Sequence, residues 1–316
     1  MAPDSFSERA SAAFQRGFVR TCFKPFIGPP FGATTQRRIV GLLAPLMPGV
    51  RGPGLRTVEL GRFAVEIVTP QRAGSGAILY LHGGAFCLGS PRTHRSITTR
   101  LARDTRTPVW VPGYRLAPEH PYPAALDDAL ACHEAMLAAG IPAAQIVLAG
   151  DSAGASLALA LALRLKAGGA ALPAGLALVS PVTRMPPPGP DAYPHGAVDP
   201  MVRADWVRQG VGWYACAPGD DAHHPLRADL AGLPPMLVQA GDQEILLPDA
   251  QALAAHARAC GLSCRFELHR ERWHVFHLQA FYLRSAANAI GALAQFARER
   301  IDAAAQAAQP EEDAAP

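Results

Sequence analysis

Residues 146–154 read IVLAGDSAG, and this stretch decides the fold. A short apolar run ends at Gly150, and Ser152 then stands between small residues before an apolar helical stretch. Strand, sharp turn and helix in this order form a nucleophile elbow, which exposes a serine hydroxyl above the end of the strand. Gly150 and Gly154 let the strand and the helix approach each other closely. Ser152 is therefore the candidate nucleophile, although the bare pattern G-x-S-x-G also occurs in ordinary turns.

Outward from this elbow, short apolar runs alternate with helical stretches. Residues 56–67 alternate apolar and polar side chains around Gly61 and Arg62, which predicts a hairpin. The further predicted strands are residues 77–81, 109–111, 146–149, 176–179, 236–239 and 265–268. The main predicted helices are residues 124–139, 156–166, 249–260 and 278–300. Short buried strands that alternate with helices predict an α/β protein with a mostly parallel, doubly wound central sheet flanked by helices.

Two regions interrupt this alternation and indicate a lid. Residues 1–50 contain helical pieces broken by Pro and Gly, and we predict that they form N-terminal lid helices. Residues 183–235 are too long for a simple connection, so we predict a second lid segment over the carboxyl edge of the sheet. Its bulky side chains include Trp206, Trp213 and Tyr214. The catalytic domain then spans residues 51–300, and residues 301–316 form a disordered tail.

The composition argues against several functional classes. The formal net charge is +3 and the 29 Lys and Arg residues are dispersed, so we expect no nucleic-acid partner. The richest apolar run, residues 157–163, is too short to span a bilayer, and residues 1–10 lack the apolar region of a secretory signal. We therefore expect a cytoplasmic protein with no stable membrane insertion. The sequence leaves open whether the chain forms a homodimer.

The six cysteines are scattered along the chain. Cys260 and Cys264 are close enough to be read as metal ligands, but no second close pair completes a zinc site. We expect free thiols, no metal and no cofactor.

A glycine-rich loop, HGGA over residues 82–85, directly follows a predicted strand. Acyl transfer needs backbone N–H groups that point at the developing oxyanion, and glycines let the main chain come close to the substrate. The H-G-G pattern is the form that this loop takes in lipases and esterases. Gly83 and Gly84, with Ala153 after the serine, are the candidate oxyanion donors. We expect His82 to be structural, because the loop needs its backbone.

The general base should be a histidine between the last strand and the final helix, because the chain order of such triads is Ser, acid, His. His274 in ERWHVF (residues 271–276) has this position, and His277, at the expected start of the final helix, is its nearest rival.

The acid should follow the strand predicted over residues 236–239. Asp242, Glu244 and Asp249 compete there, and spacing alone does not choose between them. Asp249 has the position of a helix N-cap or first-turn acid, which would occupy its carboxylate with backbone N–H groups.

Four motifs together give the chain a recognisable pattern. They are LHGGA (81–85), YRLAPEHPYPAALDD (114–128), GDSAG (150–154) and WHVF (273–276). The chain resembles the hormone-sensitive-lipase-like family of bacterial carboxylesterases, which has the α/β-hydrolase fold, over about residues 55–297. LPP at 233–235 and EILL at 244–247 add to the resemblance, while Ala85, Ala155 and Arg184 depart from the family pattern.

The resemblance implies a carboxylic ester hydrolase that acts on short- to medium-chain acyl esters of small molecules through a covalent acyl-enzyme, without a cofactor. Carried over position by position, it implies the nucleophile, the base, the acid and the three oxyanion donors as Ser152, His274, Glu244, Gly83, Gly84 and Ala153. A lactonase or an amidase would share this triad. A non-catalytic ligand-binding protein on the same scaffold is disfavoured because His274 is present.

Overall fold

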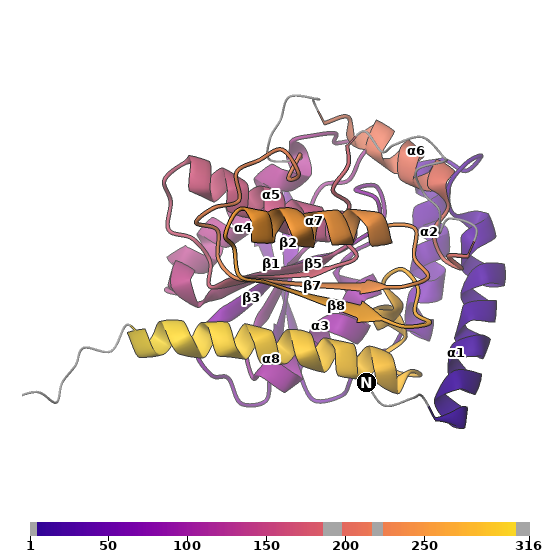
Figure 1. The fold of residues 1–316 in the computed structure, drawn as a ribbon, viewed down its shortest axis with the longest axis horizontal. Helices are drawn as coiled ribbons and strands as arrows, with labels where there is room; N and C mark the ends of the chain where they lie inside the picture. Colours follow the sequence, from indigo (N-terminus) through magenta and orange to yellow (C-terminus); the bar gives the residue numbers. More distant parts are fainter. Residues whose placement is uncertain (1–4, 186–197, 217–223, 308–316) are drawn as a thin grey trace, which may run out of the picture.

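The computed structural model describes residues 5–185, 198–216 and 224–307. Its strands form an eight-stranded sheet in the order β1-β2-β4-β3-β5-β6-β7-β8 (Figure 1). β1 and β2 form the predicted antiparallel hairpin, β2 is also antiparallel to β4, and the remaining neighbours are parallel. The strand bounds are β1 Gly54–Leu60, β2 Phe63–Thr69, β3 Ala77–Leu81, β4 Val109–Pro112, β5 Ile146–Asp151, β6 Gly175–Val179, β7 Met236–Gly241 and β8 Cys264–His269.

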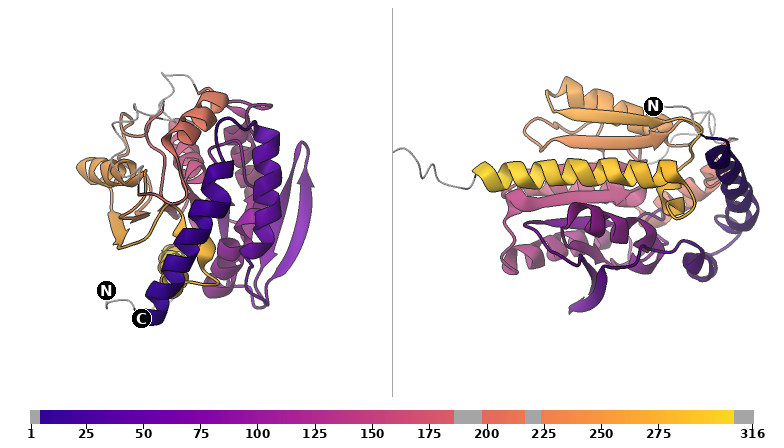
Figure 2. Two further views of the ribbon diagram at one scale, coloured as in Figure 1. Left: turned by 90° about the vertical axis from the view of Figure 1, so that its right-hand side faces the viewer. Right: turned by 90° about the horizontal axis from the view of Figure 1, so that it is seen from below.

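Helices cover both faces of this sheet (Figures 1 and 2). One face packs against α4 (Ala124–Ala138), α5 (Ala153–Ala167) and α7 (Leu247–Ala259), and the other against α3 (Arg95–Thr105) and α8 (Arg284–Ala307). Every residue of β3, β5, β6 and β7 is therefore buried, which explains their largely apolar runs. The predicted doubly wound α/β sheet is confirmed.

Three further helices lie at the end of the sheet to which the parallel strands point (Figure 1). They are α1 (Phe6–Phe18), α2 (Ala33–Leu43) and α6 (Ala204–Tyr214), and we call them and the turns that join α1 to α2 the cap. The cap comes from the two segments that the sequence assigns to a lid. Parts of the second segment, residues 186–197 and 217–223, lie outside the described residues.

The C-terminal part of the chain corrects two expectations. The predicted helix over residues 278–300 begins later, at Arg284, because a 3-10 turn (Phe276–Gln279) comes first. The same helix ends at Ala307, so the first residues of the predicted disordered tail, 301–316, are helical. Alanine is the strongest helix former, and Ile301 is buried, so the helix continues. Residues 308–316 lie outside the described residues.

No helix in the described ranges is long and apolar enough to cross a membrane.

Candidate active site

Ser152 lies at the junction of β5 and α5 in a strained backbone conformation, with φ 52° and ψ −120°. The glycines around it are required by close packing. A Cβ at Gly154 would lie 2.0 Å from the carbonyl oxygen of Leu81, and one at Gly150 would lie 2.6 Å from the same oxygen. Strand, turn and helix therefore have the arrangement that the sequence predicts. A positive φ at a non-glycine residue is costly and is kept where a sharp turn must expose a side chain.

The loop after β3 runs beside Ser152, and both Gly83 and Gly84 line the same pocket as the serine. Gly84 has φ +124°, which favours glycine. The N–H of Gly83 donates to Oδ1 of Asp151 at 3.1 Å. This bond corrects the prediction that Gly83 is an oxyanion donor, because its N–H already has a buried anionic acceptor. Gly84 and Ala153 remain as candidate donors, and Ala153 opens α5, where backbone N–H groups have no partner inside the helix.

The carboxylate of Asp151 holds the glycine-rich loop of residues 82–85 in place through its hydrogen bond to Gly83. This carboxylate is buried and accepts a hydrogen bond from the Tyr80 hydroxyl at 2.7 Å, and Nε2 of His94 lies 3.4 Å away. Burial by itself would raise the pKa of Asp151, but His94 and the hydroxyl of Tyr80 outweigh it, and the pKa is lowered. Asp151 is therefore a stable anion that fixes Gly83. This role does not follow from the sequence pattern alone, although the aspartate of the G-D-S-A-G motif is its signal.

His82 has a structural role, as expected. Its ring is buried, stacks on Tyr114 with centroids 4.2 Å apart, and has Nδ1 3.0 Å from the carbonyl oxygen of Gly83. Burial lowers the pKa of His82 to about 3, so the ring stays neutral. The hydroxyl of Tyr114 donates to the carbonyl of His82 at 2.6 Å, and Arg115 forms an ion pair with Asp128 at 2.7 Å. The YRLAPE segment (residues 114–119) therefore holds the glycine-rich loop of residues 82–85 in place.

His274 and Glu244 lie side by side in the loops after β8 and β7. Nδ1 of His274 is 3.8 Å from Oε1 of Glu244, and both side chains are buried. Oε2 of Glu244 accepts hydrogen bonds from the Ser180 hydroxyl and the Gly241 N–H, both at 2.8 Å. Burial by itself would lower the pKa of His274, but the Glu244 carboxylate outweighs it, so the pKa is raised above the ordinary 6.5.

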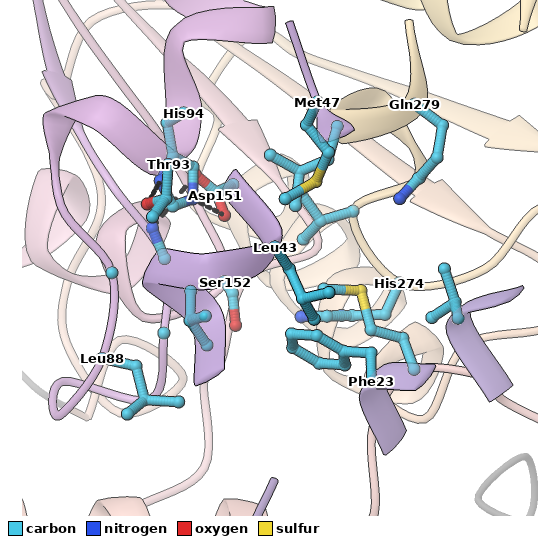
Figure 3. A pocket seen from close by; sticks show the side chains of 18 of the residues that line it. Phe23, Leu43, Met47, Leu88, Thr93, His94, Asp151, Ser152, His274 and Gln279 are labelled. Carbon is cyan, nitrogen blue, oxygen red and sulfur yellow. Dashed lines mark hydrogen bonds and ion pairs between the residues drawn. The ribbon is translucent and has the colours of Figure 1, made fainter. Parts of the chain in front are cut away.

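The His274 ring points toward the Ser152 hydroxyl (Figure 3). No hydrogen bond joins the two side chains among the described contacts, and 3.8 Å to Glu244 is also longer than a hydrogen bond. Such contacts in a site without substrate often shorten only when substrate binds.

The alternative base, His277, and the alternative acid Asp249 make their contacts with other residues. His277 is buried with Nε2 2.9 Å from Oε1 of Gln239, and burial holds its pKa well below the ordinary value. Asp249 lies in the first turn of α7, one of its two expected positions, but its carboxylate does not cap that helix. Its Oδ2 instead accepts from the backbone N–H groups of Thr183 (2.9 Å) and Arg184 (3.2 Å), which lie on the loop after β6. Asp242 shows no contact with His274 among the described interactions, so Glu244 is the one of the three candidate acids that these interactions place beside His274.

A further buried carboxylate, Asp199, was not anticipated from the sequence. Oδ1 accepts from the N–H groups of Met201 (2.8 Å) and Val202 (3.1 Å), and Oδ2 accepts from Ile245 N–H at 2.9 Å. Burial raises the pKa of Asp199, with the nearby His274 opposing the shift. Asp199 therefore ties the segment before α6 to the Glu244 loop. Only the folded chain shows this, since 45 residues separate the two segments in the sequence.

A pocket opens directly on Ser152 and His274 (Figure 3). Most of its wall is apolar and comes from the cap and from the turns before α3 and α8. Cap side chains that line it include Phe18, Phe23, Leu43 and Trp206, and Met47 joins them from the turn after α2. The polar side chains of the wall beyond the triad and its neighbours are Gln15, Thr93, His94 and Gln279. The two segments predicted as a lid therefore shape the binding pocket.

The described residues contain no group of three His, Cys, Asp or Glu side chains placed to hold a metal ion. Cys260 and Cys264 are free thiols, as are Cys22, Cys87 and Cys132.

Comparison with known proteins agrees with this arrangement. A family model described as the alpha/beta hydrolase fold matches residues 78–278. An esterase of Acinetobacter venetianus is 36% identical over 264 residues, which cover 83% of this chain and 87% of that protein. An acetyl-hydrolase of Streptomyces hygroscopicus is 38% identical over 224 residues, which cover 70% of this chain and 74% of that protein.

Solved structures give the same result. The crystal structure of an esterase from the bacterial hormone-sensitive lipase family matches with a TM-score of 0.86 and 32% identity, covering 95% of this chain and all of that one. A crystal structure of a related esterase soaked with p-nitrophenyl butyrate matches with a TM-score of 0.85 and 29% identity, covering 92% and 99%.

Fold and elbow define a serine hydrolase with the α/β-hydrolase fold. Within that class, the chain belongs to the hormone-sensitive-lipase-like family of bacterial carboxylesterases, as its motifs predict.

Proposed function

We propose that the chain hydrolyses carboxylic esters of short- to medium-chain acyl groups through Ser152, His274 and Glu244. The observation that carries the proposal is that a strained Ser152 and a buried His274 line one apolar pocket, with the buried Glu244 carboxylate beside Nδ1 of His274. The relatives are named as esterases and an acetyl-hydrolase, which supports the same chemistry.

In the proposed reaction, Ser152 Oγ attacks the ester carbonyl while its proton passes to His274. The Glu244 carboxylate accepts a hydrogen bond from the Nδ1–H of His274 and stabilises the imidazolium that forms. The N–H groups of Gly84 and Ala153 bind the oxyanion, and Gly83 keeps the loop in place through Asp151. His274 then protonates the leaving alcohol. Water, activated by the same histidine, releases the acid from the acyl-enzyme.

The chain-length preference follows from the cap. Aromatic side chains of the cap, Phe18, Phe23 and Trp206, line the pocket beside the catalytic residues. A longer acyl chain gains about 0.8 kcal/mol per buried CH₂ only while an apolar surface receives it. We propose that the cap acts as a lid that ends this surface after a short or medium chain. A cytoplasmic location and the absence of a cofactor remain predictions.

The test uses p-nitrophenyl esters of graded chain length, with a p-nitroanilide and a lactone to separate amidase and lactonase activity. We expect kcat/KM to peak at short or medium esters, and Ser152→Ala to lower kcat by about three to six orders of magnitude. An organophosphate should label Ser152, read by mass spectrometry of peptides. Ser156→Ala is the matched control, because Ser156 lies one turn along α5 and its hydroxyl hydrogen bonds to the Val182 carbonyl. Labelling of another serine, with Ser152→Ala still active, would refute the assignment.

A further inference from the structure

Two amide side chains interrupt the apolar wall of the pocket. Gln279 ends the 3-10 turn after His274, and Gln15 lies on α1 of the cap. Gln279 is 4% exposed and Gln15 is 7% exposed, so bulk water does not hydrate either side chain. In Figure 3, Gln279 extends toward the pocket on the side of Met47.

The side-chain amide of Gln279 makes no hydrogen bond within the described part of the chain. Its Oε1 is buried and has no hydrogen-bond partner there, and no described residue hydrogen bonds to its nitrogen. An unpartnered amide in an apolar wall costs free energy that a methionine of similar length would not. Thr93 and His94 of the same wall are paired, since Thr93 Oγ1 and His94 Nδ1 contact each other at 2.8 Å. A buried amide without a partner is the feature expected where a substrate supplies the partner.

The chemistry of an amide narrows what that partner is. Gln offers an acceptor and two donors, and rotation about its terminal torsion exchanges them easily. A hydroxyl group both donates and accepts one hydrogen bond, so it can use either orientation of the amide. A charged group is disfavoured, because the wall near Gln279 is formed by Met47, Val275 and Leu278.

We infer that Gln279 binds a hydroxyl group of the substrate, so that the preferred substrates are esters with a hydroxyl on the acyl chain or on the alcohol part. The inference rests on the proposed ester hydrolysis and names its substrate class. Gln15, on the facing cap helix, is the second amide able to reach such a hydroxyl. A site built to bond a hydroxyl rejects the analogue that lacks it much more strongly than an apolar pocket rejects an added methyl group.

The test compares hydroxylated esters with isosteres that carry a methyl group instead. Ethyl 3-hydroxybutanoate against ethyl 3-methylbutanoate tests the acyl side, and 2-hydroxyethyl butanoate against propyl butanoate tests the alcohol side. In the wild-type protein we expect kcat/KM to favour the hydroxyl at least about tenfold in one of the two pairs. Gln279→Met should bring that ratio close to one. Leu278→Met is the matched control, since it alters the neighbouring wall position and should keep the ratio.

The outcomes separate this inference from the proposed function. If no ester is hydrolysed, the proposed function fails. If all four esters are hydrolysed and both wild-type ratios are near one, the hydroxyl inference is wrong and ester hydrolysis stands. A high ratio that survives in Gln279→Met also overturns the inference, because another group must then read the hydroxyl. Should Gln279→Met fail to fold, Gln279→Leu takes its place, and wild-type ratios near one overturn the inference without any variant.

Discussion

Replacing Glu244 by Gln should leave the protein folded and almost inactive. Oε2 of Glu244 accepts from the Ser180 hydroxyl and the Gly241 N–H, both at 2.8 Å. The amide oxygen of Gln keeps both bonds only if it takes this position. The amide nitrogen must then replace Oε1, which faces Nδ1 of His274 at 3.8 Å.

A donor in that position reverses the proton arrangement of the imidazole. Nδ1 must accept, so the proton moves to Nε2, which then cannot take the proton of Ser152. The same error in another triad costs about 10⁴ in kcat, and we expect a fall of roughly 10³–10⁴ here, or about 4–5.5 kcal/mol of transition-state stabilisation. The midpoint of thermal unfolding should change little, because the two hydrogen bonds to Oε2 survive.

The assay is kcat/KM with p-nitrophenyl butyrate, beside Asp242→Asn and Asp249→Asn as matched carboxylate-to-amide controls. Asp242→Asn should stay near wild-type activity. Asp249→Asn should lower the unfolding midpoint more than the activity, because Asp249 holds the backbone of Thr183 and Arg184. A severe loss in Asp242→Asn together with a mild one in Glu244→Gln would show that the acid is misassigned.

Three further predictions concern His274, Gly154 and Asp199. The acid limb of the kcat/KM profile should have its midpoint above about 6.5, since the pKa of His274 is raised and only the neutral ring takes the serine proton; a midpoint below 6 would contradict this. Gly154→Ala should prevent folding or destabilise the protein severely, as its Cβ would lie 2.0 Å from the Leu81 carbonyl, whereas Gly291→Ala on α8 has free space and should be neutral or stabilising by up to about 1 kcal/mol in chemical denaturation. Asp199→Asn should move the acid-limb midpoint downward, because the charge of Asp199 raises the pKa of His274; an unchanged midpoint would contradict that coupling.

The fold was largely predictable because most strands can be recognised from their own short stretch of sequence. Strands buried on both faces are mostly apolar, so β3, β5, β6 and β7 are visible as short, largely apolar runs between helices, interrupted by Gln239 in β7 and by Asp151 at the end of β5. The end of the chain was less predictable. The segment after His274 continues the helical pattern of α8 in sequence, yet Val275 adopts φ 46° and a separate 3-10 turn follows. A tertiary contact there overrides local propensity.

The site was predictable where motif and chemistry coincide. Ser152, His274 and Glu244 come together as expected, because each follows the carboxyl end of a parallel strand, and those ends share one edge of the sheet. The partners that do not touch the reacting atoms were missed. Asp151 takes the N–H of Gly83, and Asp199 joins two distant segments, and neither contact has a spacing rule in the sequence.

The cap is physically connected to the segment that carries His274. Both oxygens of Glu8 on α1 accept hydrogen bonds from the first N–H groups of α8, Arg284 at 3.0 Å and Ser285 at 2.9 Å. Arg16, further along α1, donates to the carbonyl of Glu271 just before the His274 loop. The start of the cap is therefore fixed to the same turn that carries the base and Gln279. α2 is held elsewhere, since Arg37 forms an ion pair with Glu119 and donates to the carbonyl of Cys87, so the two sides of the pocket are fastened to different segments of the chain.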